Sequence, residues 1–128
     1  QDGPGVDIVH DLEEPLPKKW GKFQHVDLCS VLEHVRRPWV LAETVQALMA
    51  RKATILVSVP FVWRIHSYPS DFWRMTPEAL DVLFPGIGWT EKRFVVRNRL
   101  RKRVPGINWS GEKFLARAET VAFACSIS

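Results

Sequence analysis

Apolar and polar positions follow a pattern along the chain that predicts five strands. Residues 6–11 alternate well enough for a short strand. Residues 26–32 and 53–59 are compact apolar runs of the kind found in buried central strands, and Pro60 is expected to end the second of them. Residues 91–100 and 120–127 also have strand character.

Two helices are predicted between these strands. Pro38 favours a helix start, and apolar residues follow it at helical spacing to about Met49. Thr76 offers an N-cap hydroxyl before Pro77 and Glu78, which predicts a second helix to about Phe84. A further short helix is expected within residues 112–118. This order of elements predicts an α/β layer fold with a mixed sheet of about five strands and helices packed on it.

Length and composition predict a single domain spanning residues 1–128. The chain is 46% hydrophobic, which excludes a disordered protein. It contains no run of about 18 apolar residues, so no membrane span is expected. Cys29 and Cys125 lie far apart in apolar runs, and we interpret them as small core residues of a cytoplasmic protein.

The basic residues are concentrated in one segment. Seven of the 18 lysines and arginines lie between Lys92 and Arg103, with no acid among them. Alternating arginines at 97, 99, 101 and 103 could follow a phosphate backbone. A strand edge guarded by charge is the commoner explanation, so nucleic-acid binding is the less favoured interpretation.

Candidate polar groups follow three of the predicted strands, at residues 11–12, 32–34 and 60–61. In open α/β sheets, ligands bind in the crevice outside the carboxyl ends of the strands. An acid such as Asp11 can accept hydrogen bonds from a ligand there, or it can simply cap a turn. The sequence leaves both interpretations open.

A denser group of polar side chains lies in residues 66–74. His66, Tyr68, Asp71 and Arg74 supply an imidazole, a phenol, a carboxylate and a guanidinium beside the ring of Trp73. Such a set can bind a polar substrate, with His66 or Asp71 as a general base. Alternatively, an Asp71–Arg74 ion pair ties the loop down, and the aromatic rings are hydrophobic anchors.

Other common catalytic signatures are missing from the sequence. No pair of cysteines or histidines has zinc-site spacing, so no metal site is predicted. No nucleophile elbow and no Gly-rich phosphate loop is present. The four histidines are scattered along the chain: His10, His25, His34 and His66.

Taken together, several segments resemble class I S-adenosylmethionine-dependent methyltransferases of the small-molecule type. They are VDIVHDLEEPLP at 6–17, VDLCSVLEHV at 26–35, with the family's Leu-Glu-His signature, and LVSVPF at 56–61. Residues 66–80 are similar to a His-x-Tyr-Pro-x-Asp-aromatic-Trp-Arg-x-Thr-Pro-Glu segment in a subset of that family. The resemblance covers residues 6 to about 95 and implies part of a Rossmann-like methyltransferase sheet.

The resemblance also implies roles for individual residues. Asp11 would accept from the adenine amine of S-adenosylmethionine, and Leu12 would pack on the ring. The methionine side of the cofactor would be lined by Ser30, Leu32 and His34. The pocket for a small polar acceptor would be formed by the catalytic residues His66 and Asp71 and the binding residues Tyr68, Trp73 and Arg74.

Two departures from the family pattern qualify this expectation. Residues 50–53 replace the Pro-Gly-Gly turn, and the family's first strand, Gly-x-Gly-x-Gly loop and second strand are absent from the sequence. We therefore expect a truncated form whose cofactor site is completed by other residues. An exposed central-type strand further predicts a homo-oligomer. The alternative is a non-catalytic domain that serves as an assembly or binding module.

Overall fold

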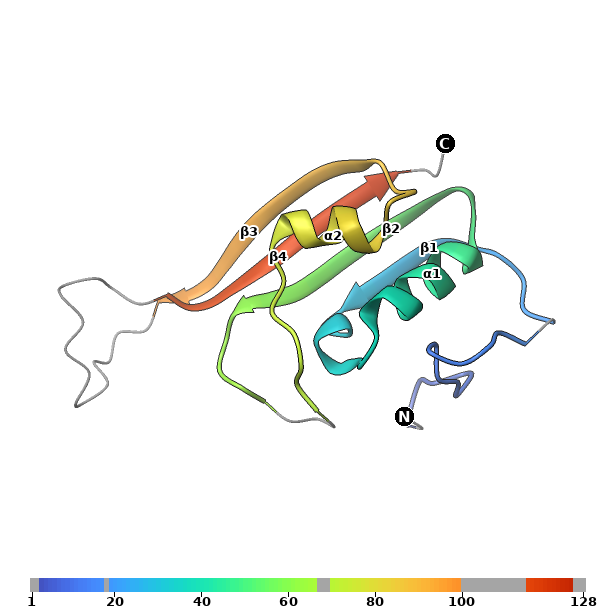
Figure 1. Cartoon of the computed structure of the whole chain (residues 1–128), viewed down its shortest axis with the longest axis horizontal. Coiled ribbons are helices and arrows are strands. Elements are labelled where there is room, and N and C mark those ends of the chain that lie inside the picture. Colours follow the sequence, from blue (N-terminus) through green and yellow to red (C-terminus); the bar gives the residue numbers. More distant parts are fainter. Residues whose placement is uncertain (1–2, 18, 67–69, 100–114, 126–128) are drawn as a thin grey trace.

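Four strands form one mixed sheet in the order β1-β2-β4-β3 (Figure 1). The computed structural model describes residues 3–17, 19–66, 70–99 and 115–125. Strand β1 is parallel to β2, and β4 is antiparallel to both of its neighbours, β2 and β3. The strands are β1 (Phe23–Cys29), β2 (Met49–Val62), β3 (Trp89–Arg99) and β4 (Leu115–Cys125).

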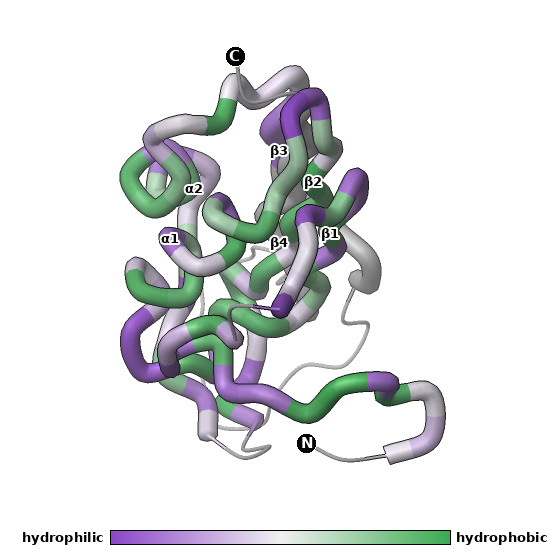
Figure 2. Tube along the Cα trace, turned by 90° about the vertical axis from the view of Figure 1, so that its right-hand side faces the viewer, coloured by the Kyte–Doolittle hydropathy of each residue, from purple (hydrophilic) through white to green (hydrophobic). Residues whose placement is uncertain are grey.

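Both α-helices pack on the same face of this sheet, α1 (Pro38–Leu48) beside α2 (Pro77–Leu83) (Figures 1 and 2). Side chains alternate across a strand, so every second residue of β2 faces the helices. The core comprises these β2 residues, which are fully buried, together with apolar side chains of both helices and of Leu28 in β1. The β2 residues that alternate in this way and are 0% exposed are Ala53, Ile55, Val57 and Val59.

The predicted start of each helix is confirmed. Pro38 is the first residue of α1, and Pro77 is the first residue of α2. The Thr76 hydroxyl oxygen accepts a hydrogen bond from the backbone N–H of Ala79 at 3.3 Å, which satisfies one N–H group that the helix itself leaves unpaired.

Replacing Thr76 with alanine is expected to lower the free energy of unfolding by about 1 kcal/mol, because the N-cap hydrogen bond is lost. Urea denaturation monitored by circular dichroism measures the change. Thr76→Ser keeps the hydroxyl and is the matched control, so we expect it to retain most of the stability. Equal losses in the two variants would contradict a capping role.

The predicted strand at residues 6–11 is wrong. This segment forms turns and loop, and runs outside the sheet (Figures 1 and 2). The side chains of Val6, Ile8 and Val9 are 42%, 57% and 58% exposed. A strand needs a neighbour that satisfies its backbone groups, and β1 does not pair with this segment. The described residues therefore form four strands, and β1 is an edge of their sheet.

Three smaller expectations are also corrected. Strand β2 continues through Pro60 to Val62. Pro60 has no N–H group to donate, but β1 pairs with β2 only as far as Ser58, and the pairing with β4 has a register shift between Pro60 and Val62, so the strand tolerates the proline. Residues 115–118 belong to β4 and not to a helix. Cys29 is exposed, because it shares the helix-free face of β1 with His25 and Asp27.

Two sequence expectations bear on surfaces. Among the described residues, no helix is both long and apolar enough to cross a bilayer.

Within the basic segment, Lys92 contacts Asp81 and Arg93 lies 2.9 Å from Glu91, so both are paired with acids. Arg101, Lys102 and Arg103 lie outside the described residues, and nucleic-acid binding there stays untested.

Candidate functional site

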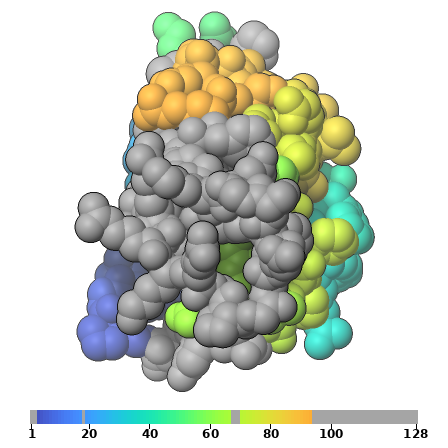
Figure 3. Space-filling view, turned by 90° about the vertical axis from the view of Figure 1, so that its left-hand side faces the viewer, coloured from blue at the N-terminus to red at the C-terminus, as the bar shows by residue number. Residues whose placement is uncertain are grey.

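The polar residues that follow β1 and β2 meet at one edge of the sheet. The 3-10 helix η1 (Leu32–His34) comes shortly after β1. The segment after β2 is described at residues 63–66 and 70–76, which form loop, and we call it the 63–76 loop. The backbone N–H of Phe72 donates to the carbonyl of Glu33 at 2.7 Å, and that of Met75 donates to the carbonyl of Pro60 at 3.2 Å. In Figure 3 this loop, green to yellow-green, reaches the surface beside the teal region of η1 and α1.

An ion pair between Asp71 and Arg74 anchors the loop. The two guanidinium nitrogens Nη1 and Nη2 donate to the carboxylate at 2.5 and 2.8 Å. Nη2 also donates to the carbonyls of Trp63 and Arg64 at 3.4 and 3.2 Å. The Asp71 side chain is 1% exposed. The ion pair that the sequence offered as the alternative to a catalytic role is thus present, and its hydrogen bonds engage both oxygens of the Asp71 carboxylate.

Each partner shifts the pKa of the other. Hydrogen bonds from Arg74 hold the pKa of Asp71 far below its ordinary value, against the opposing effect of burial. The same hydrogen bonds raise the pKa of Arg74. Both groups therefore stay charged at neutral pH.

His66 is held by the same carboxylate. Its backbone N–H donates to Oδ2 of Asp71 at 2.8 Å, and its ring atom Nδ1 lies 3.1 Å from that oxygen. The His66 side chain is 31% exposed, and its other ring nitrogen, Nε2, lies 3.9 Å from Oε1 of the buried Glu33. This arrangement can orient an imidazole for proton transfer.

Glu33 belongs to the candidate group at residues 32–34, but the sequence predicted no role of its own for it. Its side chain is completely buried, and both carboxylate oxygens lack hydrogen-bond partners among the described residues. Burial raises its pKa. Oε1 lies 3.6 Å from Nε2 of His34 and 3.9 Å from Nε2 of His66. Its place directly after an apolar strand run was the available signal.

Three residues predicted for the cofactor lie at the end of β1. Ser30 is exposed, has a left-handed backbone with φ of 54°, and donates its N–H to the Ser58 carbonyl at 2.9 Å. Leu32 is completely buried in the core. His34 is half-buried, and its Nδ1 contacts the Ser70 carbonyl.

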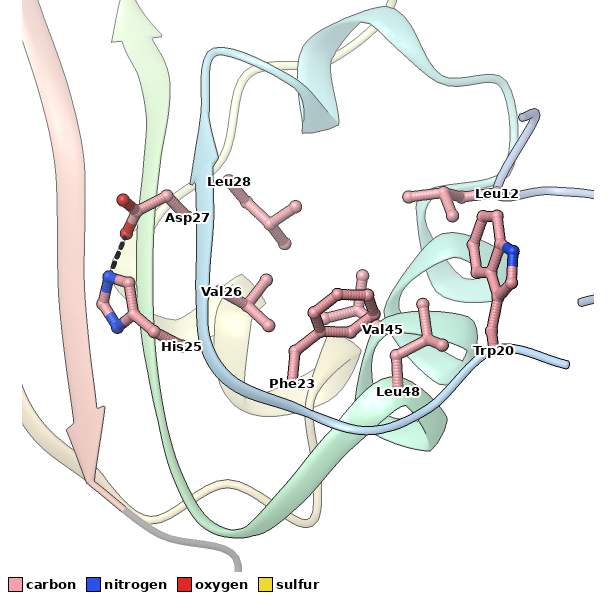
Figure 4. Close-up of a pocket in the computed structure, with 9 residues that line it drawn as sticks. All are labelled: Leu12, Trp20, Phe23, His25, Val26, Asp27, Leu28, Val45 and Leu48. Carbon is pink, nitrogen blue, oxygen red and sulfur yellow. Dashed lines mark ion pairs between the residues drawn. The ribbon is translucent and has the colours of Figure 1, made fainter. Parts of the chain in front are cut away.

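The other two predicted cofactor residues occupy different surroundings. Oδ1 of Asp11 accepts from the N–H of Glu13 at 2.9 Å, so this acid caps a turn. The side chain of Leu12 lines a pocket of about 320 Å³ between β1, α1 and the N-terminal segment, beside Trp20 (Figure 4). The pocket is mainly apolar and contains neither Glu33 nor His66. Because ligands of such sheets bind at the carboxyl ends of strands, we place the chemistry at Glu33 and His66 instead.

Trp73 and Tyr68 are the two aromatic residues predicted to bind the acceptor. Trp73 donates its indole N–H to the Val35 carbonyl at 2.9 Å and meets the ring of Trp39 edge-on. This contact ties the loop to the segment before α1, as expected of an anchor. Tyr68 lies outside the described residues, so its predicted role stays untested.

Comparison with known proteins shows the fold of S-adenosylmethionine-dependent methyltransferases. No family model and no curated protein matches the sequence. A chain in the Haloferax volcanii complex between the Trm112 methyltransferase activator and a candidate methyltransferase matches with a TM-score of 0.62 at 13% identity, over 94% of this chain and 60% of that one.

Two further solved structures are similar. One is a SAM-dependent methyltransferase from Archaeoglobus fulgidus (TM-score 0.55, 12% identity, 82% of this chain and 60% of that one). The other is a mutant of the 16S rRNA (adenine(1408)-N(1))-methyltransferase from Catenulisporales acidiphilia (TM-score 0.57, 18% identity, 93% and 61%). The chain thus spans about 60% of the length of each of these three proteins.

Proposed function

We propose that this chain supplies the acceptor side of a methyltransferase site that uses S-adenosylmethionine and a small polar acceptor. The observation that carries the proposal is the meeting of η1 and the 63–76 loop at the carboxyl ends of two parallel strands. That edge is where α/β sheets of this type bind ligands. The fold similarity supports the choice of reaction.

The proposed reaction is an in-line displacement. The sulfonium–methyl bond breaks as a bond forms between the methyl group and an oxygen, nitrogen or carbon of the acceptor. S-adenosylhomocysteine leaves as a neutral sulfide, and a proton of the acceptor passes to His66 or to water. Such a reaction depends mainly on holding the two reactants in line and on excluding water.

The geometry divides the predicted acceptor residues into two groups. Asp71 and Arg74 satisfy each other, so we assign them as positioning residues that orient His66. The His66 ring is partly exposed and does not share the Asp71–Arg74 hydrogen bonds, so it is the group that would face the acceptor. Trp73 holds the loop against Val35, which places these groups beside η1.

The residues after β1 fit part of a cofactor site. Ser30 is exposed at the strand end, and His34 is half-buried next to it, so both can contact the methionine portion of the cofactor. Leu32 could contribute only its backbone, because its side chain lies in the core. The sequence has no Gly-x-Gly-x-Gly loop, so tight binding would require residues from outside these 128.

Titration with S-adenosylhomocysteine tests the proposal. At a ligand concentration ten times the dissociation constant, binding contributes about 1.4 kcal/mol to stability, so we expect the melting temperature to rise by a few degrees. ATP is the matched control ligand, because it shares the adenosine moiety and lacks the amino-acid portion. No heat and no thermal shift at millimolar S-adenosylhomocysteine would contradict cofactor binding by this chain alone.

A non-catalytic role as an assembly module is the second candidate. The free edge of β1 among the described strands favours it, because an unpaired strand edge can pair with another chain. The same titration separates the two, since a module of this kind need not bind the cofactor.

A further inference from the structure

Three side chains with metal-binding atoms converge between the ends of β1 and β2. Glu33 and His34 come from η1, and His66 comes from the loop after β2. One ligand atom from each lies within 4.8 Å of those of the other two. The imidazole rings of His34 and His66 meet edge-on, with centroids 5.0 Å apart. The 31 residues between the two histidines in the sequence hid this cluster from any spacing rule.

The outer contacts of both rings turn a lone pair toward the centre of the cluster. Nδ1 of His34 contacts the carbonyl of Ser70, while Nδ1 of His66 lies 3.1 Å from Oδ2 of Asp71 and 3.3 Å from the Arg64 carbonyl. Carbonyl and carboxylate oxygens only accept hydrogen bonds, so we assign the ring hydrogen to Nδ1 in each case. Each Nε2 then presents a lone pair. This outer arrangement is typical of histidines that bind metals.

The third group in the cluster, Glu33, is a buried carboxyl group without a hydrogen-bond partner among the described residues. Glu33 is 0% exposed, and neither of its carboxylate oxygens has a hydrogen-bond partner in the described part of the chain. Arg74 cannot supply the missing charge directly, because its guanidinium donates to Asp71 and to backbone carbonyls. Burying an unpaired carboxylate is costly, and such groups in proteins are generally paired or coordinate a metal.

The distances suit a bound ion. Two ligands held tetrahedrally at zinc–nitrogen or zinc–oxygen bond lengths lie about 3.4 Å apart. The corresponding separations here are 3.6 Å from Glu33 to His34 and 3.9 Å from Glu33 to His66. The ligand atoms of the two histidines lie within 4.8 Å of each other, so they would have to approach by up to about 1.4 Å for all three atoms to bind one ion.

We propose that Glu33, His34 and His66 bind a divalent transition-metal cation, with Ser70 and Asp71 as outer partners that orient the two imidazoles. Imidazole nitrogens suit zinc, cobalt and iron, whereas magnesium and calcium prefer oxygen ligands throughout. Three protein ligands leave a coordination position open, as in catalytic zinc sites.

The open coordination position could bind the methyl acceptor, an inference that rests on the proposed function. A hydroxyl or carboxylate of the acceptor could occupy it, and a coordinated hydroxyl loses its proton more easily because the cation lowers its pKa. With the metal bound, Nε2 of His66 is a ligand and not a base, so the proton passes to water. The acceptors favoured by such a site are therefore oxygen-bearing small molecules. Metal binding can be measured without cofactor or acceptor, so the metal site and the methyltransferase function can each be contradicted independently.

The experiment is a titration of the tag-free protein with cobalt(II), followed by visible absorption and calorimetry, with zinc competing. We expect one ion per chain and visible bands of low-symmetry cobalt. His34→Ala and His66→Ala should each weaken binding by more than about 100-fold, since the loss of an outer partner alone costs 10- to 100-fold. His25→Ala is the matched control, because His25 also lies beside a carboxylate, 2.9 Å from Asp27. This variant should bind cobalt with unchanged affinity.

A readout on the unsubstituted protein guards against misfolded variants. Paramagnetic cobalt should shift or broaden the ring-proton resonances of His34 and His66 and leave those of His25 in place. Failure of the folded protein to bind cobalt or zinc would overturn the proposal, as would equal loss in His25→Ala. Binding of magnesium in preference to both would overturn the assigned class of metal.

Discussion

Replacing Asp71 with alanine is expected to lower the free energy of unfolding by about 2–4 kcal/mol. Removing one member of a buried ion pair typically costs about 3–5 kcal/mol, because the remaining charge is left without its partner. We take a smaller value because the Arg74 side chain is 26% exposed and water can solvate it in part. The substitution also removes the acceptor for the backbone N–H of His66. Chemical denaturation of the two proteins side by side measures the difference.

A surface pair between α2 and β3 provides the matched control. Asp81 contacts Lys92, but the Asp81 side chain is 51% exposed. Exposed pairs contribute about 0–1 kcal/mol, so Asp81→Ala should change stability by no more than that. Similar losses in the two variants would contradict the assignment of the Asp71 carboxylate as the anchor of the loop.

The pH dependence of the Asp71 effect has a definite sign. Because Arg74 lowers the pKa of Asp71 in the folded chain, the carboxylate stabilises the fold fully above its unfolded pKa of about 3.9. That contribution is lost as the pH falls through the lower folded value. The stability difference between Asp71→Asn and the unsubstituted chain should thus be constant near neutrality and shrink in acid.

Replacing Phe84 with alanine is expected to cost about 3–5 kcal/mol, the range for deleting a buried aromatic ring. Phe84 is 0% exposed and contacts the ring of Trp89 edge-on at 5.8 Å between centroids. The ring lies where the end of α2 meets the start of β3, so the deletion leaves a cavity between helix and sheet. Thermal and urea denaturation report the loss.

Val82, on the same helix, is the control for this deletion. Its side chain is 81% exposed, and Val82→Ala should change stability by less than about 0.5 kcal/mol. If Phe84→Ala were equally mild, Phe84 would not belong to the core that joins α2 to the sheet. Retention of the far-ultraviolet spectrum shows whether each variant is folded.

Local signals predicted the elements that depend on few neighbours. Thr76, Pro77 and the acid after them define a helix start through contacts within one turn, and the structure has that start. The apolar runs near Leu28 and Val57 predicted strands because a buried strand excludes polar residues. The Asp71–Arg74 pair was also predictable, since its members are only three positions apart in the sequence.

The prediction at residues 6–11 failed for a physical reason. Alternation of Val6, Ile8 and Val9 with polar residues satisfies the side-chain requirement of a strand, but the backbone requirement depends on another strand alongside. The four strands among the described residues provide none for this segment. Leu12 therefore lies in the apolar pocket beside Trp20 and not at the end of a strand (Figure 4).

The sequence by itself determined the α/β class, the two helix starts and the segments whose ends carry polar groups, because these follow from periodicity and short-range capping. Only the tertiary structure decided that Glu33, His34 and His66 form one cluster. Parallel pairing of β1 with β2 brings the two strand ends to the same edge, and the buried Asp71–Arg74 pair holds the loop that carries His66 against η1. Such long-range contacts leave no periodic trace in the sequence.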